Sequence, residues 1–175
     1  MARPVALIAE PIHEEFDAWL GERCEISRRA PDEGRDFLEA LRRSDALVVR
    51  TYTTVGERLL DLAPNLRVVG RAGVGLDNID VEACRARGVE VVHTPEANAE
   101  AVCELVYAFI LDAIRPRVFL DRALDSHEWS GLRSDLVAPR QIAGSTLGVM
   151  GFGRIGRRVA RVARAFGARV LFHDL

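Results

Sequence analysis

The sequence predicts an α/β fold in which helices cover a parallel β-sheet, and three observations lead to this prediction. Short apolar runs alternate with helical patterns along the 175-residue chain, as in doubly wound folds. The apolar runs are continuous, which is typical of parallel strands covered on both faces. A Gly-X-Gly-X-X-Gly segment near the end of the chain lies between a predicted strand and a predicted helix.

The first predicted element is an apolar strand at residues 5–8, before Glu10 and Pro11. Four further short runs have the length and composition of strands, and the run at residues 25–27 is the weakest of them. The five predicted strands span residues 5–8, 25–27, 46–49, 66–69 and 89–92.

Helical patterns connect these strands, and most of them have a recognisable start. Asp32 and Asp80 are candidate N-caps because a carboxylate can accept hydrogen bonds from the first free N–H groups of a helix. Thr54 and Glu57 have the spacing of a capping box. We therefore expect helices at residues 13–20, 32–43, 55–62 and 81–87.

The pattern changes near Pro95, and we place a domain boundary there, with residues 1–97 in the first domain and residues 98–175 in the second. Asn98 can cap a long amphipathic helix over Ala99–Ile114, which Pro116 should end or kink. We then expect, in order, a helix at residues 117–125, a loop at 126–145, a strand at Thr146–Met150, a helix at 154–166 and a strand at Arg169–His173.

The segment Gly151-Phe152-Gly153-Arg154-Ile155-Gly156 has the spacing of a dinucleotide-binding loop. Gly151 permits a tight turn, Gly153 lets the backbone approach a pyrophosphate, and Gly156 lets the helix pack close to the strand. The following helix N-terminus presents free N–H groups to the phosphates. Asp174, after the next strand, can bind a ribose and would repel the 2′-phosphate of NADP. The segment favours NAD as a cofactor; the alternative is a glycine-rich turn in an unrelated α/β protein.

A second run of small residues, at positions 70–75, follows the fourth predicted strand and leads to Asp80. Consecutive small residues expose backbone N–H groups, which can form an anion-binding concavity. The carboxyl end of a strand is where open α/β sheets bind ligands. A carboxylate substrate would fit such a loop, and a tight strand-to-helix turn is the alternative.

Composition excludes several functions. The chain has 24 basic and 26 acidic residues, and every basic residue is arginine. Without lysine there is no Schiff-base chemistry and no GxxxxGK[ST] phosphate loop. A near-neutral charge argues against a nucleic-acid or anionic-membrane partner. The last predicted helix carries four arginines, which we expect to form a solvated face. Nucleic-acid binding through them is the alternative. These residues are Arg157, Arg158, Arg161 and Arg164.

Cysteine and histidine positions favour a cytoplasmic protein without a metal site. Cys24, Cys84 and Cys103 are far apart, which predicts reduced and mostly buried thiols. The four histidines lack the spacing of metal ligands. No apolar run is long enough to cross a membrane.

Four stretches together resemble the D-isomer-specific 2-hydroxyacid dehydrogenases, most closely their phosphoglycerate-dehydrogenase-like branch. They occur in the family's order and cover most of the chain. The four matching stretches are residues 49–51, residues 70–80, residues 94–98 with 101–104, and residues 147–156.

The resemblance implies a fold, a reaction and a set of site residues. Residues 1–97 would form a flavodoxin-like substrate domain, and residues 98–175 would hold a linker helix and the first β-α-β unit of a Rossmann NAD-binding domain. The reaction would transfer a hydride between NAD(H) and a D-2-hydroxy acid or 2-keto acid, and the Ala99–Ile114 helix would help form a homodimer. The implied substrate-binding residues are Arg50, Gly73, Val74 and Gly75, and the implied cofactor-binding residues are Gly151, Gly153, Arg154, Ile155, Gly156 and Asp174.

Two features limit what the resemblance implies. Tyr52 stands where some phosphoglycerate-type members carry a basic residue, which argues against phosphoglycerate as the substrate. For Arg50, a surface ion pair is the alternative role. The family's catalytic Arg, Glu and His lie beyond the ribose-binding acid, so we assign no catalytic residue and expect a truncated, inactive N-terminal part. The alternative is a non-catalytic module that binds a dinucleotide or pairs with a homologue.

Overall fold

The computed structural model describes residues 3–137 and 140–175. The chain divides into two compact units, Met1–Ala97 and Asn98–Leu175. Each unit has its own sheet and its own hydrophobic core. The units are described separately below.

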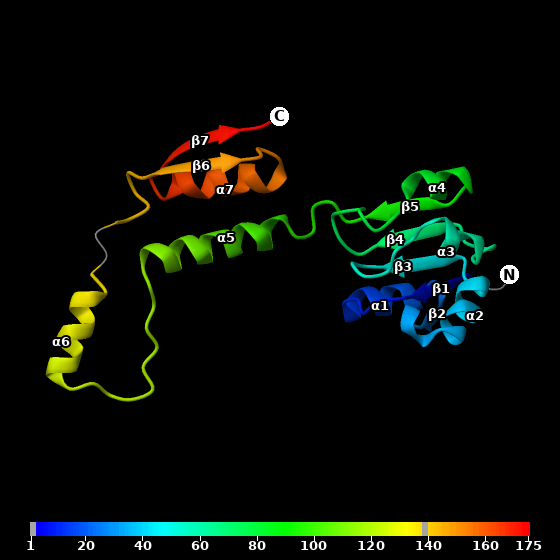
Figure 1. Ribbon diagram of the computed structural model, residues 1–175, viewed down its shortest axis with the longest axis horizontal. Helices are drawn as coiled ribbons and strands as arrows, with labels where there is room; N and C mark the ends of the chain where they lie inside the picture. The colour runs from blue at the N-terminus through cyan, green and yellow to red at the C-terminus, as the bar shows by residue number, and fades with distance from the viewer. Residues whose placement is uncertain (1–2, 138–139) are drawn as a thin grey trace. The chain divides into compact units, whose positions relative to one another are not determined.

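Unit 1 contains a five-stranded sheet in the order β2-β1-β3-β4-β5 (Figure 1). Every neighbouring pair of strands is parallel, which confirms the predicted α/β fold with a parallel sheet. The strands are β1 (Val5–Ile8), β2 (Glu25–Arg28), β3 (Ala46–Val49), β4 (Val68–Arg71) and β5 (Glu90–His93).

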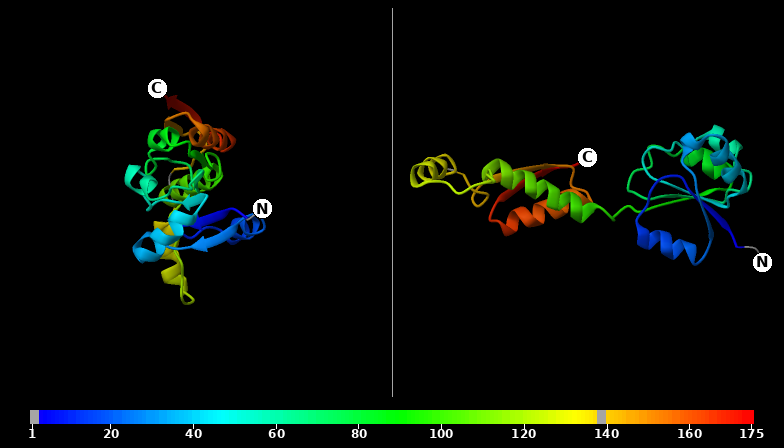
Figure 2. Two further views of the ribbon diagram at one scale, coloured as in Figure 1. Left: turned by 90° about the vertical axis from the view of Figure 1, so that its right-hand side faces the viewer. Right: turned by 90° about the horizontal axis from the view of Figure 1, so that it is seen from below.

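Four α-helices cover this sheet: α1 (Glu14–Gly21), α2 (Arg35–Arg43), α3 (Glu57–Asp61) and α4 (Val81–Ala86). Helix α1 lies on one side of the sheet, and α2, α3 and α4 lie on the other (Figure 2, right). The core of unit 1 forms under these three helices, because apolar residues of the sheet and of the helices meet there. Its largest fully buried members include Leu7, Leu41, Leu47, Val49 and Val69.

The strand order creates a defined place for a ligand. Parallel strands all point the same way, so the loops after β1, β3, β4 and β5 lie along one edge of the sheet. The direction of the chain through the sheet reverses between β1 and β3, as in flavodoxin-like folds. Ligands of such folds bind outside the carboxyl ends of the strands at this switch point.

Two predicted helix starts in unit 1 are wrong. Asp32 lies in a short 3₁₀ helix, Pro31–Glu33, and α2 begins only after Gly34, whose φ of 59° interrupts the helix. Thr54 does not cap α3, because the buried Val55 forms a bridge with Ile79 and holds the backbone extended. The cap predicted at Asp80 is confirmed, since its carboxylate accepts a hydrogen bond from the Ala83 N–H at 2.9 Å.

Strand β4 is displaced from its predicted position. It includes Gly70 and Arg71 and does not include residues 66 and 67. The glycine-rich loop therefore begins at Ala72, closer to the carboxyl edge of the sheet than the sequence suggested. Figure 1 shows β4 between β3 and β5, so this loop lies beside the loops of both neighbours.

Unit 2 is built on one parallel β-α-β element. Strands β6 (Thr146–Met150) and β7 (Arg169–His173) pair in parallel, and α7 (Arg154–Ala165) connects them. Helix α5 (Ala99–Ile114) packs against α7, and the buried residues Cys103, Tyr107, Val159 and Ala163 belong to this contact. Asn98 is the N-cap of α5, but its side chain makes no capping hydrogen bond.

The segment between α5 and β6 differs from the prediction. Residues 117–125 are not helical, and α6 (Ser126–Asp135) lies where a loop was expected. Pro116 ends the helical path, and Arg117 turns back to form two hydrogen bonds with the Asp112 carboxylate, at 2.7 and 2.9 Å. Asp125 and Glu128 form a capping box that starts α6. Residues 138 and 139 of the predicted loop lie outside the described residues.

Each helix that the structure describes is too short or too polar to span a lipid bilayer. The same ranges contain no group of three His, Cys, Asp or Glu side chains that could hold a metal ion. Cys84 and Cys103 are buried free thiols, and Cys24 is a partly buried one. Burial, with the nearby Asp80 carboxylate, raises the pKa of the Cys84 thiol, which makes it a poor nucleophile.

Candidate functional site

The loops after β1, β3 and β4 meet at the switch point of unit 1. Glu10 follows β1, residues 50–53 follow β3, and residues 72–75 follow β4. Long-range hydrogen bonds join these loops to one another. The site therefore depends on residues that are distant in the sequence and close together at the sheet edge.

Glu10 is the central residue of this edge, with 9% of its surface exposed. Its Oε1 accepts hydrogen bonds from the amide N–H groups of Arg50, Tyr52 and Thr53 at 3.0, 3.2 and 2.9 Å. Its Oε2 accepts from Thr51 and Tyr52 at 2.9 and 3.1 Å. Burial by itself raises the pKa of Glu10, but the four amide donors outweigh it and lower the pKa to about 2. The carboxylate is therefore ionised at neutral pH.

The carbonyl groups of the same loop are held from the other side. Asn78 Nδ2 donates to the carbonyl oxygens of Arg50 and Thr53 at 3.2 and 2.7 Å. Arg71 Nε donates to the Arg50 carbonyl at 3.0 Å. The Arg50 side chain is exposed, and its Nη1 donates to the Pro11 carbonyl at 3.1 Å. Both the N–H groups and two of the carbonyl groups of this loop are thus bound by side chains that are distant in the sequence.

The loop of Gly73, Val74 and Gly75 is tied to β5. The Thr94 N–H donates to the Gly73 carbonyl at 3.1 Å, and His93 Nδ1 lies 2.8 Å from the Val74 carbonyl. The Arg71 guanidinium covers Gly73, since a Cβ there would come within 2.0 Å of Arg71 Nη1. Within residues 3–137 and 140–175, the amide N–H groups of Val74 and Gly75 donate to no acceptor.

The glycine-rich loop of unit 2 connects β6 to α7. Gly151 has a φ of 88°, which an L-residue side chain disfavours. A Cβ on Gly156 would come within 2.0 Å of the Gly151 carbonyl oxygen, so the helix and the loop are in direct contact there. Gly153 is the N-cap of α7, and a Cβ on it would meet no atom within 4 Å. Space therefore remains above Gly153 for a ligand.

Three further predicted site residues, Arg154, Ile155 and Asp174, also belong to unit 2. Arg154 and Ile155 are the first residues of α7 and are both exposed. Asp174 directly follows β7 and is exposed. The Gly151 N–H donates to the His173 carbonyl at 2.8 Å, which brings the glycine-rich loop next to Asp174. On α7, Arg158 pairs with Glu100 of α5 at 2.7 Å.

A comparison with protein families identifies the chain. The model of the D-isomer specific 2-hydroxyacid dehydrogenase catalytic domain matches residues 6–167. The chain belongs to the D-isomer-specific 2-hydroxyacid dehydrogenase family. The family that the sequence resemblance predicted is thereby confirmed.

Relatives and solved structures of this family resemble the chain over nearly its whole length. It is 42% identical to D-3-phosphoglycerate dehydrogenase of Mycobacterium leprae, over 99% of this chain and 32% of that protein. A 2-hydroxyacid dehydrogenase of Ketogulonicigenium vulgare superposes with a TM-score of 0.79 at 27% identity, over 99% of this chain and 55% of that chain. Aquifex aeolicus D-lactate dehydrogenase, solved with NAD and lactic acid, gives 0.75 at 29% identity, over 98% and 51%. The chain thus spans about a third to about half of these proteins.

Sequence reasoning located the loops of this family member and missed several residues that hold them. In the sequence, Arg71 and Asn78 stand out only as members of a longer segment, His93 only as one of four histidines, and Glu10 only as the end of an apolar run. The signal for Glu10 was available, because a carboxylate directly after a buried strand at a sheet edge must find hydrogen-bond donors. The donors themselves could not be identified from the sequence.

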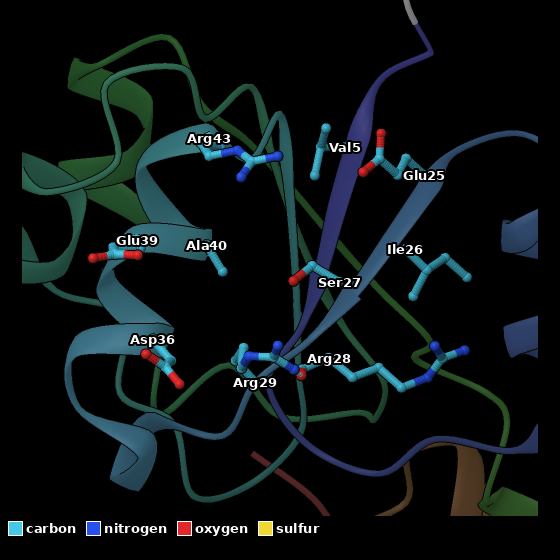
Figure 3. Close-up of a pocket in the computed structure, with 10 residues that line it drawn as sticks. All are labelled: Val5, Glu25, Ile26, Ser27, Arg28, Arg29, Asp36, Glu39, Ala40 and Arg43. Carbon is cyan, nitrogen blue, oxygen red and sulfur yellow. Dashed lines mark hydrogen bonds between the residues drawn. The ribbon is translucent and has the colours of Figure 1, made fainter.

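The described residues of unit 1 line hollows of different character. One, of about 660 Å³, is mainly apolar and includes Arg50, Arg71 and His93 at the carboxyl edge of the sheet. A second, of about 540 Å³, lies between β2 and α2, where Arg43 and Arg29 flank Ser27 (Figure 3). The predicted site residues of unit 1 border only the first of these hollows, through Arg50. We assign no role to the second.

Proposed function

We propose that this chain provides the binding sites of an NAD-dependent dehydrogenase, one for NAD(H) in unit 2 and one for the carboxylate of a 2-hydroxy or 2-keto acid in unit 1. The observation that carries the proposal is the loop at the start of α7. Its first glycine has a positive φ, its second leaves open space, and its third touches the first. This is the set of properties that a dinucleotide pyrophosphate requires of such a loop.

The residues of unit 2 fit NAD. The first N–H groups of α7 would bind the pyrophosphate, with Arg154 and Ile155 beside it. The carboxylate of Asp174 would accept hydrogen bonds from the adenosine ribose, and it would disfavour the phosphate of NADP. The NAD bound to the Aquifex aeolicus relative supports this cofactor. NAD, when bound, supplies the site of hydride transfer.

The residues of unit 1 fit a carboxylate. The N–H groups of Val74 and Gly75 donate to no acceptor among the described residues, so they are available to an anion. Arg50 lies on the neighbouring loop and would add a positive charge. We propose that these residues bind and orient the substrate carboxylate.

Catalytic turnover needs side chains beyond those of the two proposed binding sites. By family resemblance, the Arg, Glu and His of hydride transfer follow the ribose-binding acid, and His173 is not their equivalent. We therefore expect the 175-residue chain by itself to bind its ligands without oxidising or reducing them. A role as a binding module that pairs with a homologue predicts the same binding, so catalysis by the complete natural protein separates the two functions.

The test uses isothermal titration of the chain with NADH. Gly153→Ala should preserve the fold, because the new methyl group meets no protein atom within 4 Å, and should weaken NADH binding by at least about tenfold. Gly148→Ala on β6 has the same free space and lies outside the loop, so it is the matched control. Equal NADH affinities of the two variants and the wild type would count against the proposed cofactor site.

We also propose that the protein is a cytoplasmic homodimer. The partly exposed apolar residues Leu105, Phe109 and Leu111 on α5 support a contact between two copies through this helix. The three unpaired cysteines support a reducing compartment.

A further inference from the structure

Residues 50–53 form an anion-binding concavity that is already filled. Four consecutive amide N–H groups point at one carboxylate, with donor–acceptor distances from 2.9 to 3.2 Å. Successive N–H groups arranged in this way normally bind a phosphate or a carboxylate from outside the protein. Here the anion is the side chain of Glu10, which follows the neighbouring strand β1.

The position of this carboxylate matters because it lies at the switch point. Glu10 follows β1 and its four donors follow β3, and ligands of this class of sheet bind outside the carboxyl ends of these two strands. An incoming carboxylate would meet the negative charge of Glu10 and would find the backbone N–H groups of residues 50–53 already occupied. The neighbouring N–H groups of Val74 and Gly75 have no acceptor in the described ranges.

The same contact sets the direction of Arg50. Its amide donates to Glu10, its carbonyl accepts from Asn78 and Arg71, and its guanidinium donates to the carbonyl of Pro11. Pro11 is the residue after Glu10, so the two loops are connected in both directions. Loss of the Glu10 carboxylate would free the backbone that carries the Arg50 side chain.

We propose that Glu10 is a positioning residue of the substrate site: it fills the amide concavity of residues 50–53, fixes Arg50, and thereby directs the substrate carboxylate to Val74 and Gly75. This inference rests on the proposed function of unit 1. It adds a residue that contacts the loop and not the substrate.

Glu10→Ala gives the sharpest test, because the atoms removed correspond to an acetate ion. We expect the amide hydrogens of residues 50–53 to exchange at least about tenfold faster in this variant, while those of β1, β3 and β4 keep their rates. Saturating acetate should restore slow exchange, and chloride at equal ionic strength should not. Glu39→Ala, which removes an exposed carboxylate on α2, is the control and should change neither rate.

A second measurement addresses the substrate site directly. Oxalate serves as the carboxylate probe, titrated by NMR in the presence of saturating NADH. In the wild type, shifts should appear at the amides of Val74 and Gly75. In Glu10→Ala, oxalate should bind at least about tenfold more weakly or shift the amides of residues 50–53, and NADH affinity should be unchanged. Glu10→Gln, which keeps the shape of the side chain, should show the same direction of change if Glu10→Ala does not fold.

The exchange and oxalate experiments test different parts of the proposal. Unchanged exchange at residues 50–53, or no specific effect of acetate, would overturn the filled concavity. Equal oxalate binding to the wild type and the Glu10 variants would overturn the positioning role. A wild-type chain that binds neither NADH nor oxalate would overturn the proposed function, and with it the positioning role, while the exchange result would still decide whether Glu10 fills the concavity.

Discussion

At the scale of single residues, the chain uses a buried charge to organise a loop. Glu10 is held by four backbone donors and has a pKa of about 2. A buried carboxylate without donors would have a raised pKa, so the direction of the shift reports the strength of its hydrogen bonds. This residue consequently links the stability of unit 1 to pH.

The pH dependence can be predicted with its sign. The pKa of Glu10 is lower in the folded protein than its ordinary value of 4.5, so its ionised form stabilises the fold fully above pH 4.5. That stabilisation, about 3 kcal/mol, should be lost as the pH falls towards 2. Urea unfolding of the wild type and Glu10→Gln, followed by Trp19 fluorescence in a Trp129→Phe background, should differ at pH 7 and converge near pH 2. A constant difference between the two proteins across this range would contradict the prediction.

A second residue-scale prediction concerns Asp174. Its exposed carboxylate follows β7 beside the glycine-rich loop, where it would accept hydrogen bonds from the ribose hydroxyls and repel a 2′-phosphate. Asp174→Ala should lower the preference for NADH over NADPH by at least about tenfold. Fluorescence titrations with both nucleotides measure this ratio. Asp135→Ala, on α6, is a control that should leave the ratio unchanged.

At the scale of elements, the contact between α5 and α7 includes a buried hydroxyl group. The Tyr107 hydroxyl donates to the Val159 carbonyl at 2.6 Å, and the Tyr107 ring packs against Phe166 with centroids 5.6 Å apart. Burial, with a smaller contribution from Cys103, raises the pKa of this phenol. The hydroxyl is therefore protonated and a hydrogen-bond donor at neutral pH.

Tyr107→Phe should keep the ring contact and remove the hydrogen bond. We expect a loss of about 1 kcal/mol in the local stability of the α5–α7 contact, and Tyr107→Ala should cost about 3–5 kcal/mol because it also leaves a cavity. Native-state amide exchange of α7 measures both effects. If Tyr107→Phe exchanged as slowly as the wild type, the hydroxyl would have no net stabilising role.

The elements also show where local signals compete. The helix expected at residues 117–125 is absent, and α6 begins at Ser126. Both segments contain residues that can form a helix, but only the second has the reciprocal hydrogen bonds of a capping box. The first has Pro116 at its start and an arginine that pairs with Asp112 of α5.

At the scale of the whole molecule, the proposed homodimer gives the clearest prediction. Light scattering should report a mass near twice the 19.4 kDa of one chain. Phe109→Glu should shift the mass towards one chain, because the carboxylate would be buried in an apolar interface. Trp19→Glu, at an exposed apolar position on α1, is the control and should leave the mass unchanged. A wild-type chain that stays monomeric at every concentration tested would refute the dimer.

The sequence alone determined the fold class, the family and the presence of both glycine-rich loops, although the first loop begins at Ala72 and not at Gly70. These features depend on local properties: the period of apolar residues, the conformational freedom of glycine at Gly151, and the order of short segments. Local signals also located most strands to within a few residues. They were weaker at helix starts, where Gly34 and the buried Val55 override the caps suggested by Asp32 and Thr54.

Only the tertiary structure decided how the loops of unit 1 are held. The hydrogen bonds from residues 50–53 to Glu10 join positions at least 40 residues apart, and those of Asn78 to Arg50 and Thr53 join positions at least 25 apart. A sequence pattern specifies that a buried carboxylate needs donors, but the donors are chosen by the order of strands in the sheet. Strands β1 and β3 are separated by β2 along the chain and are neighbours in space, and for that reason Glu10 meets the loop of Arg50.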